Sequence, residues 1–177
     1  MLFRSYEGAS FIIVATPTNY DANTNCFDTS SVDAVVEDAL KLNVDALVVI
    51  KSTIPVGHTK SLQEKFGSGR VVFSPEFLRE GQALKDNLYP SRIIVGSHCM
   101  ASAQFVDLLK QGAEKSDIAS LFISSTEAEA VKLFANTFLA MRVSFFNELE
   151  NGISKLKKGI KTKLSSVKKI NFDSNFH

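Results

Sequence analysis

Cysteine and histidine are scarce in this chain of 177 residues, and their scarcity narrows its chemistry. The two cysteines, Cys26 and Cys99, stand far apart, and His58, His98 and His177 form no metal-ligand spacing. A structural or catalytic metal centre needs several such ligands at defined intervals, so none is expected. Two widely separated cysteines suit a reducing compartment, which predicts a cytoplasmic protein.

Long apolar runs and a strong net charge are also lacking. No run is long enough to cross a bilayer, and residues 1–9 do not resemble a signal peptide. The net charge is +1, yet residues 151–177 hold seven lysines and one acid, so the first 150 residues carry −5. A mildly acidic body gives no electrostatic reason to expect nucleic-acid binding.

Short apolar runs alternate with segments of helical period along the chain. The length and the 45% hydrophobic content allow one globular domain with a sizeable core. Strand–helix alternation at this spacing favours an α/β fold, a parallel sheet with helices on its faces. The predicted strands are Phe11–Thr16, Ala46–Ile50, Val71–Phe73, Arg92–Gly96 and Leu121–Ser124. The predicted helices are Val32–Leu42 capped by Ser30 or Ser31, Val56–Phe66, Ala101–Gln111, and one from the capping box Thr126-x-x-Glu129 through at least Leu149.

The segment from Val72 to Arg92 is the most informative in the chain. It opens as an apolar strand, breaks at Pro75, and places Glu76 and Glu80 around a Phe-Leu-Arg core before a polar loop. A solvated loop does not need an apolar pair between two acids and an arginine. A loop that wraps a polar ligand beside a strand end does, so this segment predicts a ligand-binding loop.

Two hydroxyl-rich segments follow the first two predicted strands. In parallel sheets, ligands bind at the carboxyl ends of strands, so A-T-P-T-N-Y-D (15–21) and I-K-S-T-I-P-V-G (50–57) are candidates. The first can equally be a polar turn punctuated by Pro17. The second can equally be a helix N-cap at Ser52 or Thr53 with Pro55 in the first turn.

On the predicted long helix, Lys132 and Asn136 are four residues apart and therefore share a face. An ammonium and an amide aimed at one point can stabilise an oxygen that gains negative charge. The alternative is a solvated polar stripe. If Glu76–Glu80, Thr53, Lys132 and Asn136 belong to one active site, we expect Lys132 and the Glu76–Glu80 loop to line one cleft, with Thr53 at its floor and Thr18 to one side.

These segments, together with S-P-E-F-L-R-E-G-Q-A-L-K-D-N (74–87) and S-T-E-A-E-A-V-K-L-F-A-N-T-F-L-A-M-R-V-S-F-F-N-E-L (125–149), resemble the UDP-glucose 6-dehydrogenases. They occur in the same order, over about residues 6–150. The resemblance implies a partial Rossmann-like dinucleotide-binding domain followed by a long helix. It also implies three regions: part of the NAD-binding domain (1–125), the start of the central helix and dimerisation region (126–150), and a basic, poorly ordered tail (151–177).

Members of this family use NAD to oxidise UDP-glucose twice, through an aldehyde and a cysteine thioester, to UDP-glucuronate. Carried over by position, Thr18 contacts NAD, Thr53 places the hydrolytic water and the cofactor, and Glu80 borders the NAD. Glu76 assists proton handling, while Lys132 and Asn136 stabilise the oxyanion. The resemblance assigns sugar-nucleotide binding to Lys132, Asn136 and the loop residues Glu76, Phe77, Leu78, Arg79 and Glu80. It implies a homodimer for the full-length family member and a role in polysaccharide precursor synthesis.

The chain departs from the family pattern in two ways. The glycine-rich dinucleotide fingerprint and the glycine-rich segment around the catalytic cysteine are both absent, so the polypeptide alone is expected to be inactive. The alternative is a non-catalytic nucleotide-sugar-binding module or a truncated remnant. Without the preceding half of the fold, the first strand is expected to lie at an open sheet edge. In the tail, apolar residues recur every three or four positions among lysines, so a basic amphipathic helix that binds a membrane surface or a partner is the alternative to a disordered end.

Overall fold

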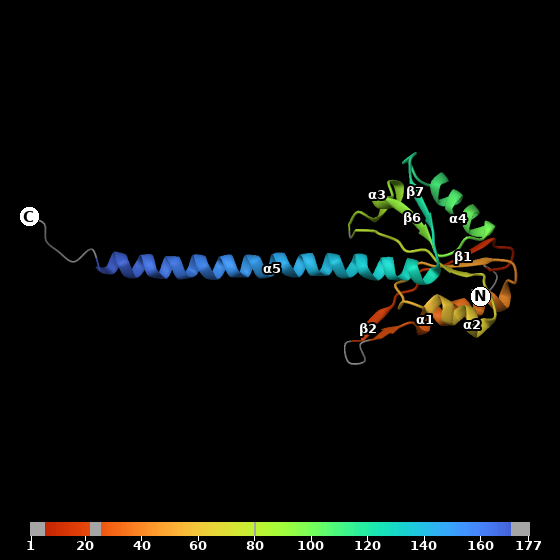
Figure 1. Cartoon of the computed structure of the whole chain (residues 1–177), viewed down its shortest axis with the longest axis horizontal. Helices are drawn as coiled ribbons and strands as arrows, with labels where there is room; N and C mark the ends of the chain where they lie inside the picture. Colours follow the sequence, from red (N-terminus) through yellow and green to blue (C-terminus); the bar gives the residue numbers. More distant parts are fainter. Residues whose placement is uncertain (1–5, 22–25, 80, 171–177) are drawn as a thin grey trace, which may run out of the picture. The chain divides into compact units, whose positions relative to one another are not determined.

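The computed structural model describes residues 6–21, 26–79 and 81–170, with backbone alone for 161–170 (Figure 1). The strands are β1 (Phe11–Val14), β2 (Asn19–Asp21), β3 (Cys26–Asp28), β4 (Leu47–Ile50), β5 (Val71–Phe73), β6 (Arg92–Val95) and β7 (Ala119–Phe122). The helices are α1 (Ser30–Leu42), α2 (His58–Phe66), α3 (Ala83–Leu88), α4 (Met100–Gln111) and α5 (Ser125–Ile170). All five predicted strands and all four predicted helices are present, with ends shifted by a few residues at most sites.

Five of the strands form parallel sheets, as the alternation of strands and helices predicts. β1, β4 and β5 pair in parallel in that order, and β6 pairs in parallel with β7. Two hydrogen bonds join the pair to the three-stranded sheet beside β5: Gly96 N–H donates to Phe73 O (2.7 Å), and Ser74 Oγ donates to Ile94 O (2.9 Å). β1 is an edge strand of its sheet, which confirms the expected open edge, and Ile13 on it is exposed.

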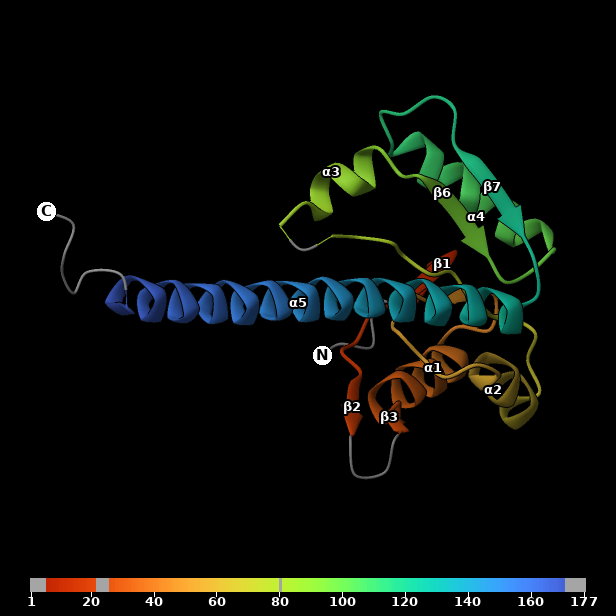
Figure 2. The same ribbon diagram turned by 60° about the vertical axis from the view of Figure 1, so that its left-hand side comes forward.

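Helices cover both faces of the sheet (Figure 2). Alternate residues of β4 point to opposite faces, since Val48 and Ile50 belong to one buried cluster and Leu47 and Val49 to the other. α1 and α2 pack on the first face, and α4 packs on the second. A strand buried on both faces reads as a continuous apolar run, which is why β4 and β5 are predictable from sequence. The predicted α/β fold with a parallel, Rossmann-like sheet is confirmed.

Three short elements were not predicted. β2 and β3 form an antiparallel pair in which the rings of Tyr20 and Phe27 lie 5.3 Å apart, although no strand was expected after the first loop. The short helix α3 replaces part of the loop expected before Tyr89. Each of these elements has six residues or fewer and is largely exposed. None of them therefore produces the long apolar period that identifies an element in a sequence.

The N-terminus of α5 is capped two residues earlier than predicted. Ser124 and Glu127 form a reciprocal capping box: Ser124 N–H and Oγ–H donate to Glu127 Oε2 (both 2.8 Å), and Glu127 N–H donates to Ser124 Oγ (3.2 Å). The predicted box, Thr126 with Glu129, is therefore wrong, because Glu129 is buried and bonds elsewhere. The prediction that Ser30 or Ser31 caps α1 is also wrong: the helix begins at Ser30, whose N–H donates to the carboxylate of Asp28 (3.0 Å).

A glycine lets α5 begin close to the end of β6. A Cβ at Gly96 would lie 2.5 Å from Ser125 Cα, and Ser125 Oγ donates to Gly96 O (2.7 Å). α5 continues to Ile170, beyond the predicted minimum at Leu149. The chain divides into two compact units within this helix, residues 1–134 and 135–177. The three-region division drawn from the sequence stays a prediction.

Candidate active site

The loops that follow β1 and β4 are joined by hydroxyl groups. Thr18 Oγ donates to Thr53 O (2.8 Å), and the buried Ser52 donates its hydroxyl to Thr16 O (2.6 Å). Because parallel strands end at the same sheet edge, these two loops meet there, as the sequence predicts. Neither Ser52 nor Thr53 caps α2, since that helix begins at His58 after the N-cap Gly57.

Lys132 and Glu76 meet at the same edge. The Lys132 ammonium donates a hydrogen bond to the backbone carbonyl of Glu76 and lies 5.5 Å from the centre of the Phe77 ring. Burial lowers the pKa of Lys132, and the carboxylate of Glu76 partly opposes that shift. A half-buried ammonium held at a fixed point is suited to stabilising negative charge on a nearby oxygen.

One cavity of about 220 Å³ brings four of the predicted residues together. Its lining includes Thr18, Thr53, Glu76 and Lys132, along with Ser52. The structure therefore brings the two hydroxyl loops, the acidic loop and the helix lysine to one place, as expected if they form one site. Lys132 does not point into bulk solvent on a separate polar stripe.

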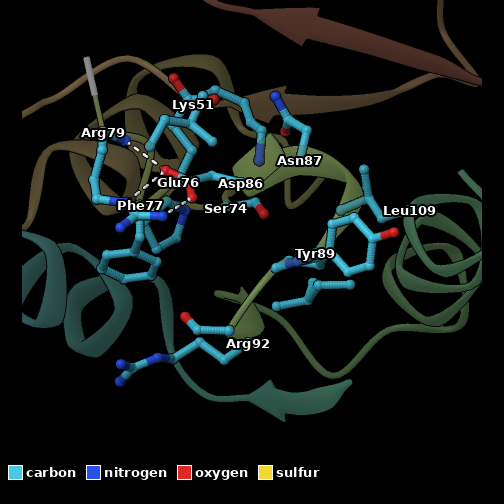
Figure 3. A pocket seen from close by; sticks show the side chains of 15 residues that line it. Lys51, Ser74, Glu76, Phe77, Arg79, Asp86, Asn87, Tyr89, Arg92 and Leu109 are labelled. Carbon is cyan, nitrogen blue, oxygen red and sulfur yellow. Dashed lines mark hydrogen bonds and ion pairs between the residues drawn. The ribbon is translucent and has the colours of Figure 1, made fainter. Parts of the chain in front are cut away.

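The acidic loop also lines a second, larger cavity of about 320 Å³ (Figure 3). Phe77, Leu78 and Arg79 contribute to its wall, together with residues of α3, β6 and α4. Figure 3 shows Arg92 on the side of Phe77, and the guanidinium carbon of Arg92 lies 5.4 Å from the centre of the Phe77 ring. The loop thus separates two cavities, and Glu76 and Lys51 line both.

Arg79 closes its own loop through Asp86. The Arg79 backbone N–H and Nε–H donate to Asp86 Oδ2 (2.8 and 3.1 Å), and Nη2 donates to Oδ1 (2.6 Å). This bidentate pair lowers the pKa of Asp86 to about 2. In this arrangement the Arg79 guanidinium is engaged with the protein, which explains how α3 is held against the loop.

The Arg79–Asp86 pair gives a direct pH prediction. The ionised carboxylate stabilises the loop fully above the ordinary Asp pKa of 3.8, and this stabilisation is lost as the pH falls towards about 2. In Arg79→Gln, the pKa of Asp86 should return towards 3.8, as measured by NMR titration of the side-chain carboxyl. Lys85→Gln is the matched control, because Lys85 is the smallest contributor to the shift, and an equal effect of both variants would contradict the assignment.

Two predicted residues are not placed in this site. Glu80 lies outside the described residues. Asn136 is exposed and belongs to the second compact unit, so its side chain is not located relative to the cavities around Lys132. The oxyanion cradle predicted from the spacing of Lys132 and Asn136 stays a prediction.

Sequence reasoning assigned no role to Lys51 and only a helix-capping role to Glu129. Lys51 follows β4 inside a segment singled out for its hydroxyls, and burial lowers its pKa. Glu129, 1% exposed, accepts hydrogen bonds from Gly57 N–H (2.5 Å), Thr59 N–H (2.8 Å) and Thr59 Oγ–H (2.5 Å). Both side chains act across distant segments, so no local sequence pattern reveals them.

The part of the chain that the structure describes lacks two classes of feature. No group of three or more histidine, cysteine, aspartate or glutamate side chains in that part of the chain could hold a metal ion. No helix in that same part is long and apolar enough to cross a membrane.

Comparison with known families identifies the family to which this chain belongs. The NAD binding domain of the UDP-glucose/GDP-mannose dehydrogenase family matches residues 5–111, and the central domain of that family matches residues 126–170. The chain belongs to the UDP-glucose/GDP-mannose dehydrogenase family. The central-domain match extends to residue 170, so the expectation that the resemblance ends at about residue 150 is wrong.

Two similar curated proteins are much longer than this chain. The UDP-glucose 6-dehydrogenase of Streptococcus pneumoniae is 52% identical over 82% of this chain and 38% of its own length. That of Campylobacter jejuni is 49% identical over 83% of this chain and 37% of its own length. The chain therefore spans little more than a third of these relatives.

Solved structures agree with the fold. A UDP-glucose dehydrogenase from Pyrobaculum islandicum superimposes with a TM-score of 0.69 at 29% identity, covering 83% of this chain and 36% of that one. A GDP-mannose dehydrogenase from Pseudomonas aeruginosa gives the same TM-score at 21% identity over 82% of this chain and 36% of that one. The second likeness supports the fold alone.

Proposed function

We propose that this chain supplies part of the cofactor and sugar site of an NAD-dependent UDP-glucose 6-dehydrogenase. The reaction converts UDP-glucose, two NAD⁺ and water to UDP-glucuronate, two NADH and three protons. The observation that carries the proposal is the cavity shared by Thr18, Thr53, Glu76 and Lys132 at the carboxyl edge of the sheet. The 52% identity to a UDP-glucose 6-dehydrogenase favours UDP-glucose over other nucleotide sugars.

The shared cavity supports roles for Lys132, Glu76 and Thr53, and the family resemblance supplies those of Asn136 and Glu80. Lys132, held at the Glu76 carbonyl, stabilises the oxyanion formed when the sugar carbonyl is attacked. Glu76 handles the proton of the water that hydrolyses the thioester. Thr53 orients that water, and Asn136 completes the oxyanion cradle. The backbone of Phe77, Leu78 and Arg79, together with Glu80, holds the sugar nucleotide.

The residues present fit one end of NAD. Hydroxyls of Thr18, Thr53 and Thr16 beside the strand ends are suited to the ribose and carboxamide groups, and Glu80 is proposed to border them. The pyrophosphate does not have a place at the N-terminus of α2, because the carboxylate of Glu129 already accepts the N–H groups of Gly57 and Thr59. NAD supplies the hydride acceptor for both oxidations.

Binding to the 177-residue polypeptide tests this assignment. In amide NMR titrations, NAD should shift signals around Thr18 and Thr53, and UDP-glucose should shift signals around Glu76 and Phe77. Lys132→Met should weaken UDP-glucose binding at least tenfold, while Lys60→Met, which changes an exposed lysine, should leave it unchanged. Tighter binding of GDP-mannose than of UDP-glucose would contradict the substrate. Binding without any change at Thr18 and Thr53 on adding NAD would favour a non-catalytic nucleotide-sugar module.

We further propose that the protein acts in the cytoplasm as a homodimer formed through α5. The second compact unit exposes many large apolar side chains on this helix: Phe138, Leu139, Met141, Val143, Phe145, Phe146, Leu149, Ile153, Leu156 and Ile160. Apolar surface of this extent is buried in stable proteins, and a second copy of the same helix matches it in chemistry. The free Cys26 and Cys99 suit a reducing compartment.

Disrupting the apolar surface should prevent association. Phe145→Glu combined with Leu149→Glu should raise the dimer dissociation constant at least a hundredfold, because charges would have to be buried in the interface. Sedimentation at micromolar concentration measures the change. Lys155→Glu, an exposed charge change on the same helix, is the control and should not alter the mass. A wild-type monomer would refute the proposal.

A further inference from the structure

Lys51 is a cation in the wall of the larger cavity. It directly follows β4, is half-buried, and lines the cavity of about 320 Å³ as well as the smaller one. Among the described residues, its ammonium makes no hydrogen bond and no ion pair within 4.0 Å. An ammonium withdrawn from water without such contacts is costly, so its environment favours an added negative group.

The other polar side chains around the larger cavity are already engaged. Ser74 donates to Ile94 O, Asn87 donates to Ala83 O, and Tyr89 donates to the carboxylate of Glu114. Arg79 and Asp86 neutralise each other. These groups therefore already have protein partners, and few polar side chains of the lining remain available to a ligand.

The charges that line the cavity do not balance. Lys51, Arg79 and Arg92 face Glu76 and Asp86, which leaves a net charge of +1. Arg92 stacks against Phe77, and Figure 3 shows it on the opposite side of the pocket from Lys51 and Asn87. On the Lys51 side, the single carboxylate of Glu76 also faces Lys132, so it does not neutralise both ammonium groups.

Burial and the neighbouring ammonium of Lys132 lower the pKa of Lys51, and the carboxylate of Glu76 opposes them. Glu76 acts on Lys132 in the same way, so one carboxylate serves two ammonium groups. A bound anion would restore the ordinary protonation of Lys51.

We propose that Lys51 binds an oxyanion, a phosphoryl or carboxylate group, in the larger cavity. Lys132 does not line this larger cavity, so the proposed anion site is distinct from the proposed oxidation site around Lys132. The cavity volume accommodates a phosphate or a small carboxylate, and the cavity net charge favours a single anion.

The test is a side-chain NMR titration of the lysines in the 177-residue polypeptide. The pH titration of Lys51 is followed alone, then with inorganic phosphate, pyrophosphate or acetate, with chloride at matched ionic strength as the reference. Phosphate or pyrophosphate should lower the acid dissociation constant of Lys51 at least tenfold, because a bound anion favours the charged ammonium. The acid dissociation constant of the exposed Lys60 should not change. A response to acetate as well identifies general oxyanion binding, whereas a response to the phosphates alone identifies a phosphoryl site.

Variants supply an independent readout. Lys51→Met should weaken phosphate binding at least tenfold, and Lys51→Arg should retain it, because the guanidinium keeps the charge. If Lys51→Met does not fold, the wild-type titration alone decides. No change at Lys51 with any of the anions overturns the proposal.

The outcome is separable from that of the proposed function. In one outcome, Lys132→Met abolishes UDP-glucose binding while no anion changes the titration of Lys51. That result would support the dehydrogenase assignment and overturn the anion site. Anion binding at Lys51 with no binding of UDP-glucose would do the reverse.

Discussion

Replacing Glu129 with alanine is expected to lower the free energy of unfolding by about 3 kcal/mol, since a buried carboxylate with several charge-assisted hydrogen bonds contributes on that scale. Glu129 is 1% exposed and accepts the N–H groups of Gly57 and Thr59 and the Thr59 hydroxyl, at the start of α2. Its removal leaves these donors buried and unpaired, and it leaves a void under α5. For a chain of this length, the melting temperature should fall by roughly 10 °C.

The matched control is Glu127→Gln, which changes an exposed carboxylate two residues away on the same helix. This change should lower stability much less than Glu129→Ala, because the side chain is exposed and glutamine can still accept the hydrogen bonds of the capping box. Glu129→Gln should lie between the two, because the amide keeps the shape and one acceptor oxygen. Chemical denaturation monitored by circular dichroism measures all three. A Glu129→Ala variant as stable as the wild type would show that α2 does not depend on this carboxylate.

The second expected result is that the 177-residue polypeptide forms no NADH from UDP-glucose and NAD. A thioester requires a cysteine sulfur at the reacting carbon, and deleting a covalent nucleophile removes that step outright. Both cysteines are exposed, and neither is among the residues that line the two cavities beside Glu76. Cys26 lies on β3 and Cys99 precedes α4.

Absorbance at the NADH wavelength measures this outcome, with a full-length family enzyme as the positive control. Cys26→Ser and Cys99→Ser variants should behave as the wild-type polypeptide. NADH production that disappears in one of these variants would mean that an alternative nucleophile operates and would contradict the prediction. Binding of UDP-glucose without turnover would agree with it, because the sugar loop and Lys132 are present.

Local patterns were enough to predict most of the fold. The continuous apolar runs at β4 and β5 indicate strands buried on both faces, and the helical period of Val32, Val36 and Ala39 indicates the buried face of α1. The geometry of a parallel sheet predicted that the loops carrying Thr53 and Glu76 lie at one sheet edge, since strand ends share that edge, and the family resemblance predicted that Lys132 lies beside them. These features depend on residues that are close in sequence or on the general geometry of parallel sheets.

Short and long-range features escaped prediction. The β2–β3 pair and α3 are too short for a reliable period, and the capping box was displaced because two S/T-x-x-E matches overlap, at Ser124 and at Thr126. Which match forms the cap depends on Glu129, whose carboxylate instead binds the start of α2, 70 residues away. A local rule cannot choose between the two because the competing partner is distant in sequence.

The sequence by itself determined the alternation of buried strands and amphipathic helices, the family, and the segments that carry the site. Tertiary structure alone decided that Lys51 lines two cavities, that Arg79 pairs with Asp86, and that Glu129 binds the start of α2. The physical reason is that backbone hydrogen bonding and apolar periodicity are encoded locally. Burial and pairing of a charged side chain depend instead on which distant segments surround it, and those segments come together only in the folded chain.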